Sequence, residues 1–227
     1  MKKFTKYSLA ACNIALVTAC GGGGSSVPAP TTTTYAIETA YTLASTTGVS
    51  LNGTAVDGAD TWTMALSATP AADEPFEGST AKKSVTSITI KKNGTTVISS
   101  GGENFFSTNP FRTKGLKLND GSYGVQTVAG SALSNTAVVG NSGSLGTVTL
   151  YSNSSKASVL FTQEGTWTLE EDTATTAYAC SNITAKDTAG VVIATTAGCY
   201  KINPGGTIAG MKYTLYVPAA GKTLVFR

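Results

Sequence analysis

Candidates for acid–base chemistry are few in this sequence. The chain contains no histidine, so a Ser-His-Asp or Cys-His arrangement lacks the imidazole that would serve as its base. Two carboxylates can act as acid and base on a glycosidic bond, and two acidic clusters supply them: Asp73, Glu74 and Glu77, and Glu170, Glu171 and Asp172. The first cluster lies in a proline-containing loop and the second directly follows a predicted strand, which is the setting of solvated turn charges. We therefore predict a protein without catalytic residues, with a carboxylate-based carbohydrate-active enzyme as an alternative.

Metal and nucleotide sites have weaker support. Asn52, Asp57 and Asp60 offer oxygen ligands for calcium, but their spacing matches no EF-hand. No glycine-rich stretch follows a strand and opens a helix, so neither nucleotide-binding fingerprint can be placed. The sequence therefore predicts no metal site and no cofactor.

Two of the four cysteines, Cys180 and Cys199, are placed to pair in an oxidising compartment. They bracket a predicted hairpin whose turn lies near Ala189-Gly190, midway between them, so a tight turn there sets the two cysteines opposite each other. Closing this loop would stabilise the fold by about 3 kcal/mol in the chain-entropy model. A metal or redox role is the alternative, although the spacing is not Cys-x-x-Cys. We predict a disulfide between these residues.

The N-terminus has the pattern of an export signal. Lys2, Lys3 and Lys6 precede an apolar run from Leu9 to Val17, which is too short to span a bilayer as a helix. The run ends in Val17-Thr18-Ala19-Cys20. Small residues before a cysteine fit the narrow cleavage site of a lipoprotein signal peptidase and leave a thiol for acylation.

Residues 17 to 20 match the lipobox of bacterial lipoproteins, and over residues 1–20 the chain resembles that class. The resemblance implies removal of residues 1–19, diacylglycerol on the Cys20 sulfur and an acylated amine that carries a chain such as palmitate. Two or more acyl chains give stable anchoring, since each buried methylene contributes about 0.8 kcal/mol. An ordinary signal peptide in which Cys20 is incidental is the alternative.

The residues that follow the lipobox predict a tether and a location. Residues 20–35 are rich in Gly, Ser, Pro and Thr, a composition typical of a disordered spacer. No acidic residue directly follows Cys20, and under the sorting rule of the lipoprotein class this implies the outer membrane. The sequence leaves open whether the protein is on the periplasmic or the cell-surface face.

The charge balance argues against nucleic acid as a partner. Three of the 16 basic residues lie in the signal segment, which leaves 13 basic and 13 acidic residues in the mature chain. No basic cluster is dense enough to follow a phosphate backbone. The predicted partners are the membrane, through the lipid anchor, and a protein or glycan.

From residue 35 onward the sequence is typical of an all-β protein. Short alternating runs rich in Thr, Val and aromatic residues are separated by turn residues, and helical periodicity is absent. Asn93-Gly94 lies between two such runs and predicts a type I′ hairpin, because both residues tolerate a positive φ. Asp120-Gly121 predicts a second turn of the same chemistry.

The chain also repeats itself. Ser87–Lys91 returns as Asn182–Lys186 at an offset of 95, and the two tryptophans, Trp62 and Trp167, both occur in Thr-Trp-Thr. Chance matching in a Thr- and Val-rich chain is the alternative, but the landmarks recur in order. In such repeats we expect both tryptophans to fill the core rather than to contact a ligand.

A repeat of about 90 residues suits a small β-sandwich. We therefore predict two tandem sandwiches, residues 36–140 and 141–227, with the seam near residues 140–146. The turn at 120–123, Asp-Gly-Ser-Tyr, is similar to turns in bacterial immunoglobulin-like modules, and this resemblance favours a sandwich over a barrel.

One aromatic group has two interpretations. Phe105, Phe106, Phe111 and Arg112 lie in a stretch otherwise rich in Gly and Asn. They form a candidate binding patch if they are exposed, since interfaces use such anchors. The alternative is a connection that folds back over its own sheet and places these residues in the core.

These observations predict a lipid-anchored cell-envelope protein that acts without catalysis, as a binding, adhesion or scaffolding module. An alternative from the same compartment is a surface lipoprotein with a single eight-stranded β-barrel that captures a ligand or host protein. In that case the two halves would share one closed sheet.

Overall fold

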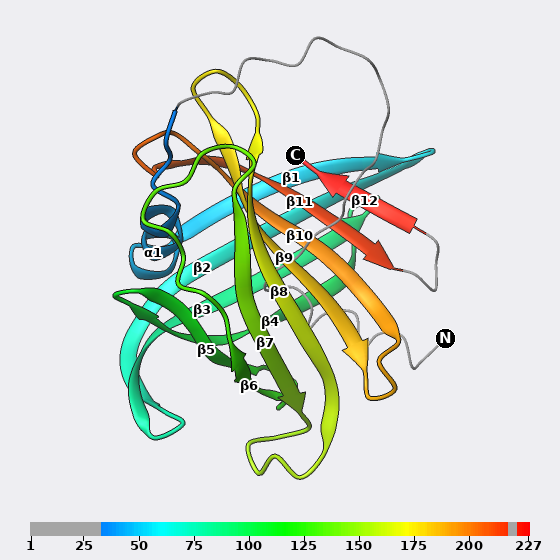
Figure 1. Cartoon of the computed structure of the whole chain (residues 1–227). Helices are drawn as coiled ribbons and strands as arrows, with labels where there is room; N and C mark the ends of the chain where they lie inside the picture. The colour runs from blue at the N-terminus through cyan, green and yellow to red at the C-terminus, as the bar shows by residue number, and fades with distance from the viewer. Residues whose placement is uncertain (1–32, 218–221) are drawn as a thin grey trace.

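The computed structural model describes residues 33–217 and 222–227, so the signal segment, Cys20 and most of the expected tether lie outside the described residues. Tyr35, which the sequence assigned to the tether, is instead buried in the core and pairs with Ala137. The first described element is a helix, α1 (Ile37–Thr46), and strands follow it (Figure 1). The strands are β1 (Val49–Asp57), β2 (Asp60–Phe76), β3 (Ser79–Lys92), β4 (Thr95–Thr108), β5 (Phe111–Leu118), β6 (Tyr123–Ala129), β7 (Ser142–Tyr151), β8 (Val159–Glu171), β9 (Ala177–Asp187), β10 (Val192–Ile202), β11 (Ile208–Val217) and β12 (Lys222–Phe226). The prediction of an all-β protein is confirmed.

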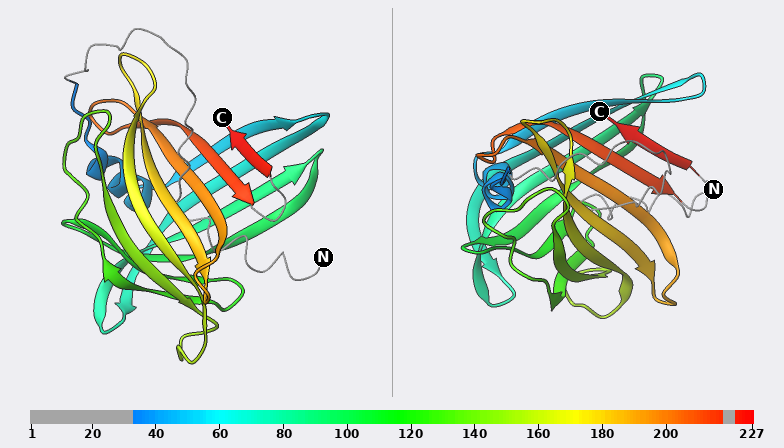
Figure 2. Two further views of the ribbon diagram at one scale, coloured as in Figure 1. Left: turned by 45° about the vertical axis from the view of Figure 1, so that its right-hand side comes forward. Right: turned by 45° about the horizontal axis from the view of Figure 1, so that its top comes forward.

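All 12 strands belong to one antiparallel sheet in which each strand pairs with the next one along the chain. The sheet curls so that its first and last strands meet (Figures 1 and 2). At this seam Thr54 and Arg227 exchange two backbone hydrogen bonds of 2.9 and 3.1 Å. The result is one sheet that nearly closes on itself around a common interior.

The predicted pair of tandem sandwiches is wrong. Strand β6 pairs with β7 and β7 with β8, so the sheet continues across the expected seam at residues 140–146. Alternating apolar and polar residues show that each strand has one buried face, but they do not tell whether that face packs against a second sheet or against the far side of its own. The alternative prediction, a single eight-stranded barrel, is correct in expecting one sheet and wrong in the number of strands.

The internal repeat falls on the two halves of this sheet. Trp62 lies in β2 and Trp167 in β8, while Ser87–Lys91 lies in β3 and Asn182–Lys186 in β9. Matching segments are thus six strands apart in a sheet of 12. As expected, both tryptophans pack against apolar clusters: Trp167 is buried, and Trp62 is partly buried.

Both predicted turns are confirmed. Asn93 and Gly94 have φ values of 48° and 83° and join β3 to β4, with Lys92 opposite Thr95. Asp120-Gly121 joins β5 to β6, and there the Ser122 amide donates to Asp120 Oδ1 at 2.9 Å. Local turn chemistry therefore decides these two connections.

The helix α1 was not predicted. Its buried residues are Ile37, Ala40 and Ala44, which follow the helical spacing of three to four residues. This apolar pattern is short, and Thr and Tyr residues, which favour strands, lie between its members. The residue composition of the segment therefore indicated a strand, although the spacing of its apolar residues is helical. The helix lies at one end of the curled sheet (Figures 1 and 2) and packs in a core cluster with strand residues of both halves. No helix among the residues described here is long and apolar enough to cross a membrane.

The far end of the β2–β3 hairpin folds over the outer face of the sheet. Its strand β2 has an irregular register between Ala71 and Glu74, and beyond that point Phe76 stacks on Phe105 with ring centroids 4.3 Å apart. Gly115 lies beneath: a Cβ there would be 2.5 Å from Phe76 Cζ. The missing side chain therefore lets the hairpin lie flat against the sheet.

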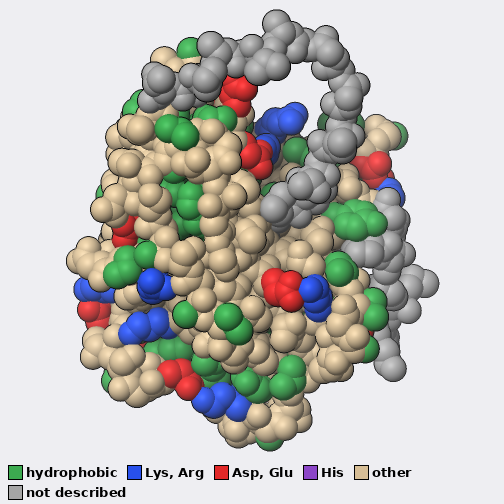
Figure 3. Space-filling view, in the orientation of Figure 1, with side chains coloured by type: hydrophobic (Ala, Val, Ile, Leu, Met, Phe, Trp, Pro, Cys, Tyr) green, Lys and Arg blue, Asp and Glu red, His purple; other side chains and the backbone are tan. Residues whose placement is uncertain are grey.

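Carboxylates near the tip of the same hairpin bind lysines of β3, of β5 and of the loop between β7 and β8. Glu74 accepts from Lys117 at 2.6 Å and from Lys83 at 2.5 Å, and these two hydrogen bonds hold the pKa of its carboxyl below the usual value. Glu77 accepts from Lys156 at 2.6 Å and from Tyr123 at 2.7 Å, with the same effect on its pKa. Ion pairs of this kind give the outer face shown in Figure 3 its neighbouring red and blue groups.

We expect this hairpin to loosen in acid. A carboxyl whose pKa is lowered in the folded state adds stability above its unfolded pKa of about 4.5, and that stability is lost as the pH falls through the folded value. The Glu74→Gln/Glu77→Gln variant should therefore lose less stability than the wild type between pH 5 and the acid transition, as measured by urea unfolding at stepped pH. Parallel pH profiles would contradict the assignment.

Candidate functional site

A cavity of about 160 Å³ lies inside the curled sheet. Its lining combines α1 with strands from both halves of the chain and is largely apolar. Residues whose side chains or backbone line it include Leu66, Ile88, Phe106, Phe111, Leu116, Val148, Ile183, Met211 and Tyr213, together with Tyr41, Ser84, Thr86, Asn104, Gln163, Ser181, Gly198, Tyr200 and Lys212. Concave, mostly apolar sites with a few polar groups are typical of small-molecule binding.

Helix α1 brings Tyr41 to the cavity. The Tyr41 hydroxyl lies 2.6 Å from Ser181 Oγ in β9 and 3.4 Å from the Ala179 carbonyl oxygen, to which it can donate. Its ring is 5.8 Å from Phe111 and 5.6 Å from Tyr200, centroid to centroid. Burial raises the pKa of Tyr41 well above its usual value, so the hydroxyl stays protonated at neutral pH.

Tyr200 in β10 supplies a second hydroxyl. Among the described residues no hydrogen bond is formed by Tyr200 Oη, and the side chain borders the cavity. Burial raises the pKa of Tyr200 to about 12. The group is therefore a neutral donor that forms no hydrogen bond with the part of the chain that the structure describes.

The other polar groups of the lining include some that are already paired and some that are buried. Asn104 Nδ2 donates to Thr86 Oγ1 at 2.8 Å, and Ser84 and Gln163 are each 3% exposed. Of the residues known to line the cavity, only Lys212 is charged, and it forms an ion pair with Glu170. The cavity thus offers no unpaired charge from those residues.

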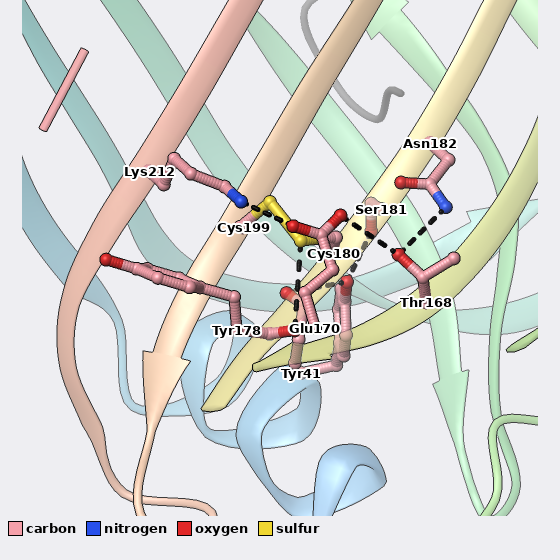
Figure 4. The surroundings of a disulfide bond; sticks show 10 residues. Tyr41, Thr168, Glu170, Tyr178, Cys180, Ser181, Asn182, Cys199 and Lys212 are labelled. Carbon is pink, nitrogen blue, oxygen red and sulfur yellow. Dashed lines mark hydrogen bonds and ion pairs between the residues drawn. A yellow bond between two sulfur atoms is a disulfide. The ribbon is translucent and has the colours of Figure 1, made fainter. Parts of the chain in front are cut away.

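The predicted cysteine pair adjoins this site. Cys180 in β9 lies opposite Cys199 in β10, and their sulfur atoms are bonded (Figure 4). Successive side chains of a strand point to opposite faces, so the neighbouring residues Ser181 and Tyr200 point toward the cavity. The disulfide therefore links the two strands that present these polar groups.

A metal site at this position is not supported. Glu170, Cys180 and Cys199 offer three ligand atoms within 4.8 Å of one another. Both sulfurs belong to the disulfide, however, and Glu170 binds Lys212 on the outer face (Figure 4). A thiolate is the form of cysteine that binds metal, and neither sulfur is one here.

The carboxylates considered for acid–base chemistry do not line the cavity. Asp73 binds Lys82 at 2.8 Å and Asp172 binds Lys201 at 2.7 Å, in addition to the ion pairs of Glu74, Glu77 and Glu170. Of the residues considered for calcium, Asp60 binds Lys92 at 2.6 Å and Asp57 binds Lys222. These side chains have lysine partners at the surface of the described structure.

The aromatic group is not an exposed patch, so that interpretation is wrong. Phe105 lies beneath Phe76 and is fully buried, while Phe106 and Phe111 stack inside the sheet with centroids 5.4 Å apart. The neighbouring Arg112 Nη1 donates to the Gly130 carbonyl oxygen at 2.5 Å. The burial alternative is correct, and Phe106 and Phe111 contribute to the cavity lining instead.

The arrangement is suited to holding a neutral molecule by apolar contact and hydrogen bonding. Comparisons with protein-family models, curated proteins and solved structures find no match to this chain. We therefore infer the function from the geometry of the cavity and from the N-terminal sequence.

Proposed function

We propose that this chain is a lipid-anchored protein of the bacterial outer membrane that acts by binding, without catalysis, and that its ligand site is the cavity inside the sheet. The observation that carries the proposal is the cavity of about 160 Å³, which is lined by strands of both halves and mainly by apolar side chains. The single curled sheet agrees with ligand capture better than with two independent adhesive modules.

The anchor part of the proposal depends on the lipobox. Cys20 precedes the described residues, and 14 residues separate it from Tyr35, which is buried in the core and pairs with Ala137. A spacer of this length and composition would keep the sheet close to the membrane while leaving it free to rotate. The diacylglycerol and acyl groups would supply the membrane affinity.

Replacing Cys20 tests the anchor. We expect Cys20→Ala to move the protein from the membrane fraction to the soluble fraction, because the lipid attachment site is lost. Cys12→Ala is the matched control, since Cys12 lies within the signal segment, and this variant should stay in the membrane fraction with an unchanged lipidated mass. A Cys20→Ala protein that still sediments with membranes would refute lipid anchoring.

A further inference from the structure

We propose that the cavity binds a neutral, largely aromatic molecule of about the size of a substituted benzene that carries one hydrogen-bond acceptor. This inference rests on the proposed binding function and specifies its ligand. It follows from the volume, the charge and the hydrogen-bonding groups of the cavity.

The volume sets the size of the ligand. The cavity measures about 160 Å³, and an apolar cavity of about 150 Å³ is large enough to bind benzene. A fatty acid or a peptide would need considerably more space. The ligand is therefore a small ring compound with a short substituent.

The lining sets the charge of the ligand. Lys212, the one charged residue among the described residues that line the cavity, forms its ion pair with Glu170 on the outer face, so its ammonium group is not available to a ligand. A charged ligand would have to enter the cavity without a free counter-ion, and burial of an unpaired charge is strongly unfavourable. The ligand is neutral.

The aromatic side chains favour a ring. Tyr41, Phe111 and Tyr200 lie together, and the ring of Tyr41 is tilted by 46° to Phe111 and by 72° to Tyr200. Such edge and tilted arrangements are the ones that aromatic groups adopt favourably with one another. A ligand ring beside them continues the same packing.

The hydroxyl of Tyr200 determines which polar group the ligand carries. It is protonated and has no hydrogen-bond partner among the described residues, whereas Tyr41 already contacts Ser181. A ligand acceptor such as a ketone oxygen would satisfy this donor. A molecule without an acceptor would leave it unpaired, which lowers the affinity.

Three fluorinated probes test the proposal by 19F NMR with the soluble full chain that carries Cys20→Ala. The probes are 4′-fluoroacetophenone, which has the acceptor, 1-ethyl-4-fluorobenzene, which lacks it, and 4-fluorobenzoate, which is charged. We expect the ketone to bind most tightly, the hydrocarbon more weakly and the benzoate not at all.

Two substitutions locate the binding. Tyr200→Phe removes only the hydroxyl and should raise the Kd of the ketone by about 2- to 10-fold, the value of one hydrogen bond, while the Kd of the hydrocarbon stays the same. Gly198→Leu should abolish binding of both probes by filling the cavity, because a Cβ at Gly198 meets only Tyr213, at 3.7 Å. Gly210→Leu is the matched control, because Gly210 lies on the neighbouring strand β11 and is not among the described residues that line the cavity. This variant should bind both neutral probes with the Kd of the unsubstituted protein.

The outcomes separate this inference from the proposed function. Failure of both neutral probes to bind, tighter binding of benzoate, or unchanged binding in Gly198→Leu would overturn the ligand assignment. None of these results affects the membrane fractionation of Cys20→Ala. Conversely, probe binding as described would stand even if the wild-type protein proved to lack lipid.

Discussion

Replacing both Cys180 and Cys199 by alanine is expected to lower the free energy of unfolding by about 3 kcal/mol. The disulfide closes a segment whose ends are 19 residues apart and joins two neighbouring strands, so its loss frees the unfolded chain more than the folded one. For a protein of this size the melting temperature should fall by about 6–12 °C. Urea unfolding and thermal melts of the Cys20→Ala protein, with and without the pair, measure the effect.

A reductant provides the control for this prediction. Dithiothreitol should lower the melting temperature of the disulfide-containing protein toward that of the double variant, and it should leave the double variant unchanged. Equal stability of the two proteins in the absence of reductant would show that the bond contributes nothing to the fold. The double variant also keeps both strands free of thiols, so oxidation cannot confuse the comparison.

The second large effect is expected from Phe106→Ala, which should destabilise the protein by about 3–5 kcal/mol. Phe106 is 3% exposed, stacks on Phe111 and belongs to the core cluster that includes α1. Removing its ring deletes apolar contacts from both the strand and the helix. The Val128→Ala variant is the control, because Val128 is 58% exposed and its loss should change stability by about 0.5 kcal/mol at most.

Chemical unfolding of both variants distinguishes a core residue from a surface residue. If Phe106→Ala proved as stable as Val128→Ala, the placement of Phe106 in the interior would be incorrect. A surface anchor would behave in that way, so the experiment also decides between the two sequence interpretations of the aromatic group. Because Phe106 is buried and Val128 is exposed, we expect a large difference between the unfolding free energies of the two variants.

Features fixed by neighbouring residues were predictable from the sequence. The hairpin at Asn93-Gly94 needs only two residues that accept a positive φ. The cysteine pair needs only a turn midway between Cys180 and Cys199, and the register of β9 and β10 places them opposite each other. In both cases the relevant geometry is complete within about 20 residues.

Features that depend on closure of the sheet were not predictable in this way. Pairing of β6 with β7 and contact of β1 with β12 follow from the twist and curl of the whole sheet, and the alternating pattern of each strand is the same in a sandwich. The cavity has the same origin, since Tyr41 meets Ser181 from a distance of 140 residues along the chain. Tyr41 also lies on α1, the helix that was not predicted because strand-forming residues lie within it.

The repeat has a consequence for how a ligand would sit. Ile88 and Leu116 contact the cavity from one half of the chain, and the residues 95 positions later, Ile183 and Met211, contact it from the other half. Two similar walls alone would allow a guest molecule two nearly equivalent poses, one the reverse of the other. Only features that occur once can choose between these poses, and the helix with Tyr41 is such a feature.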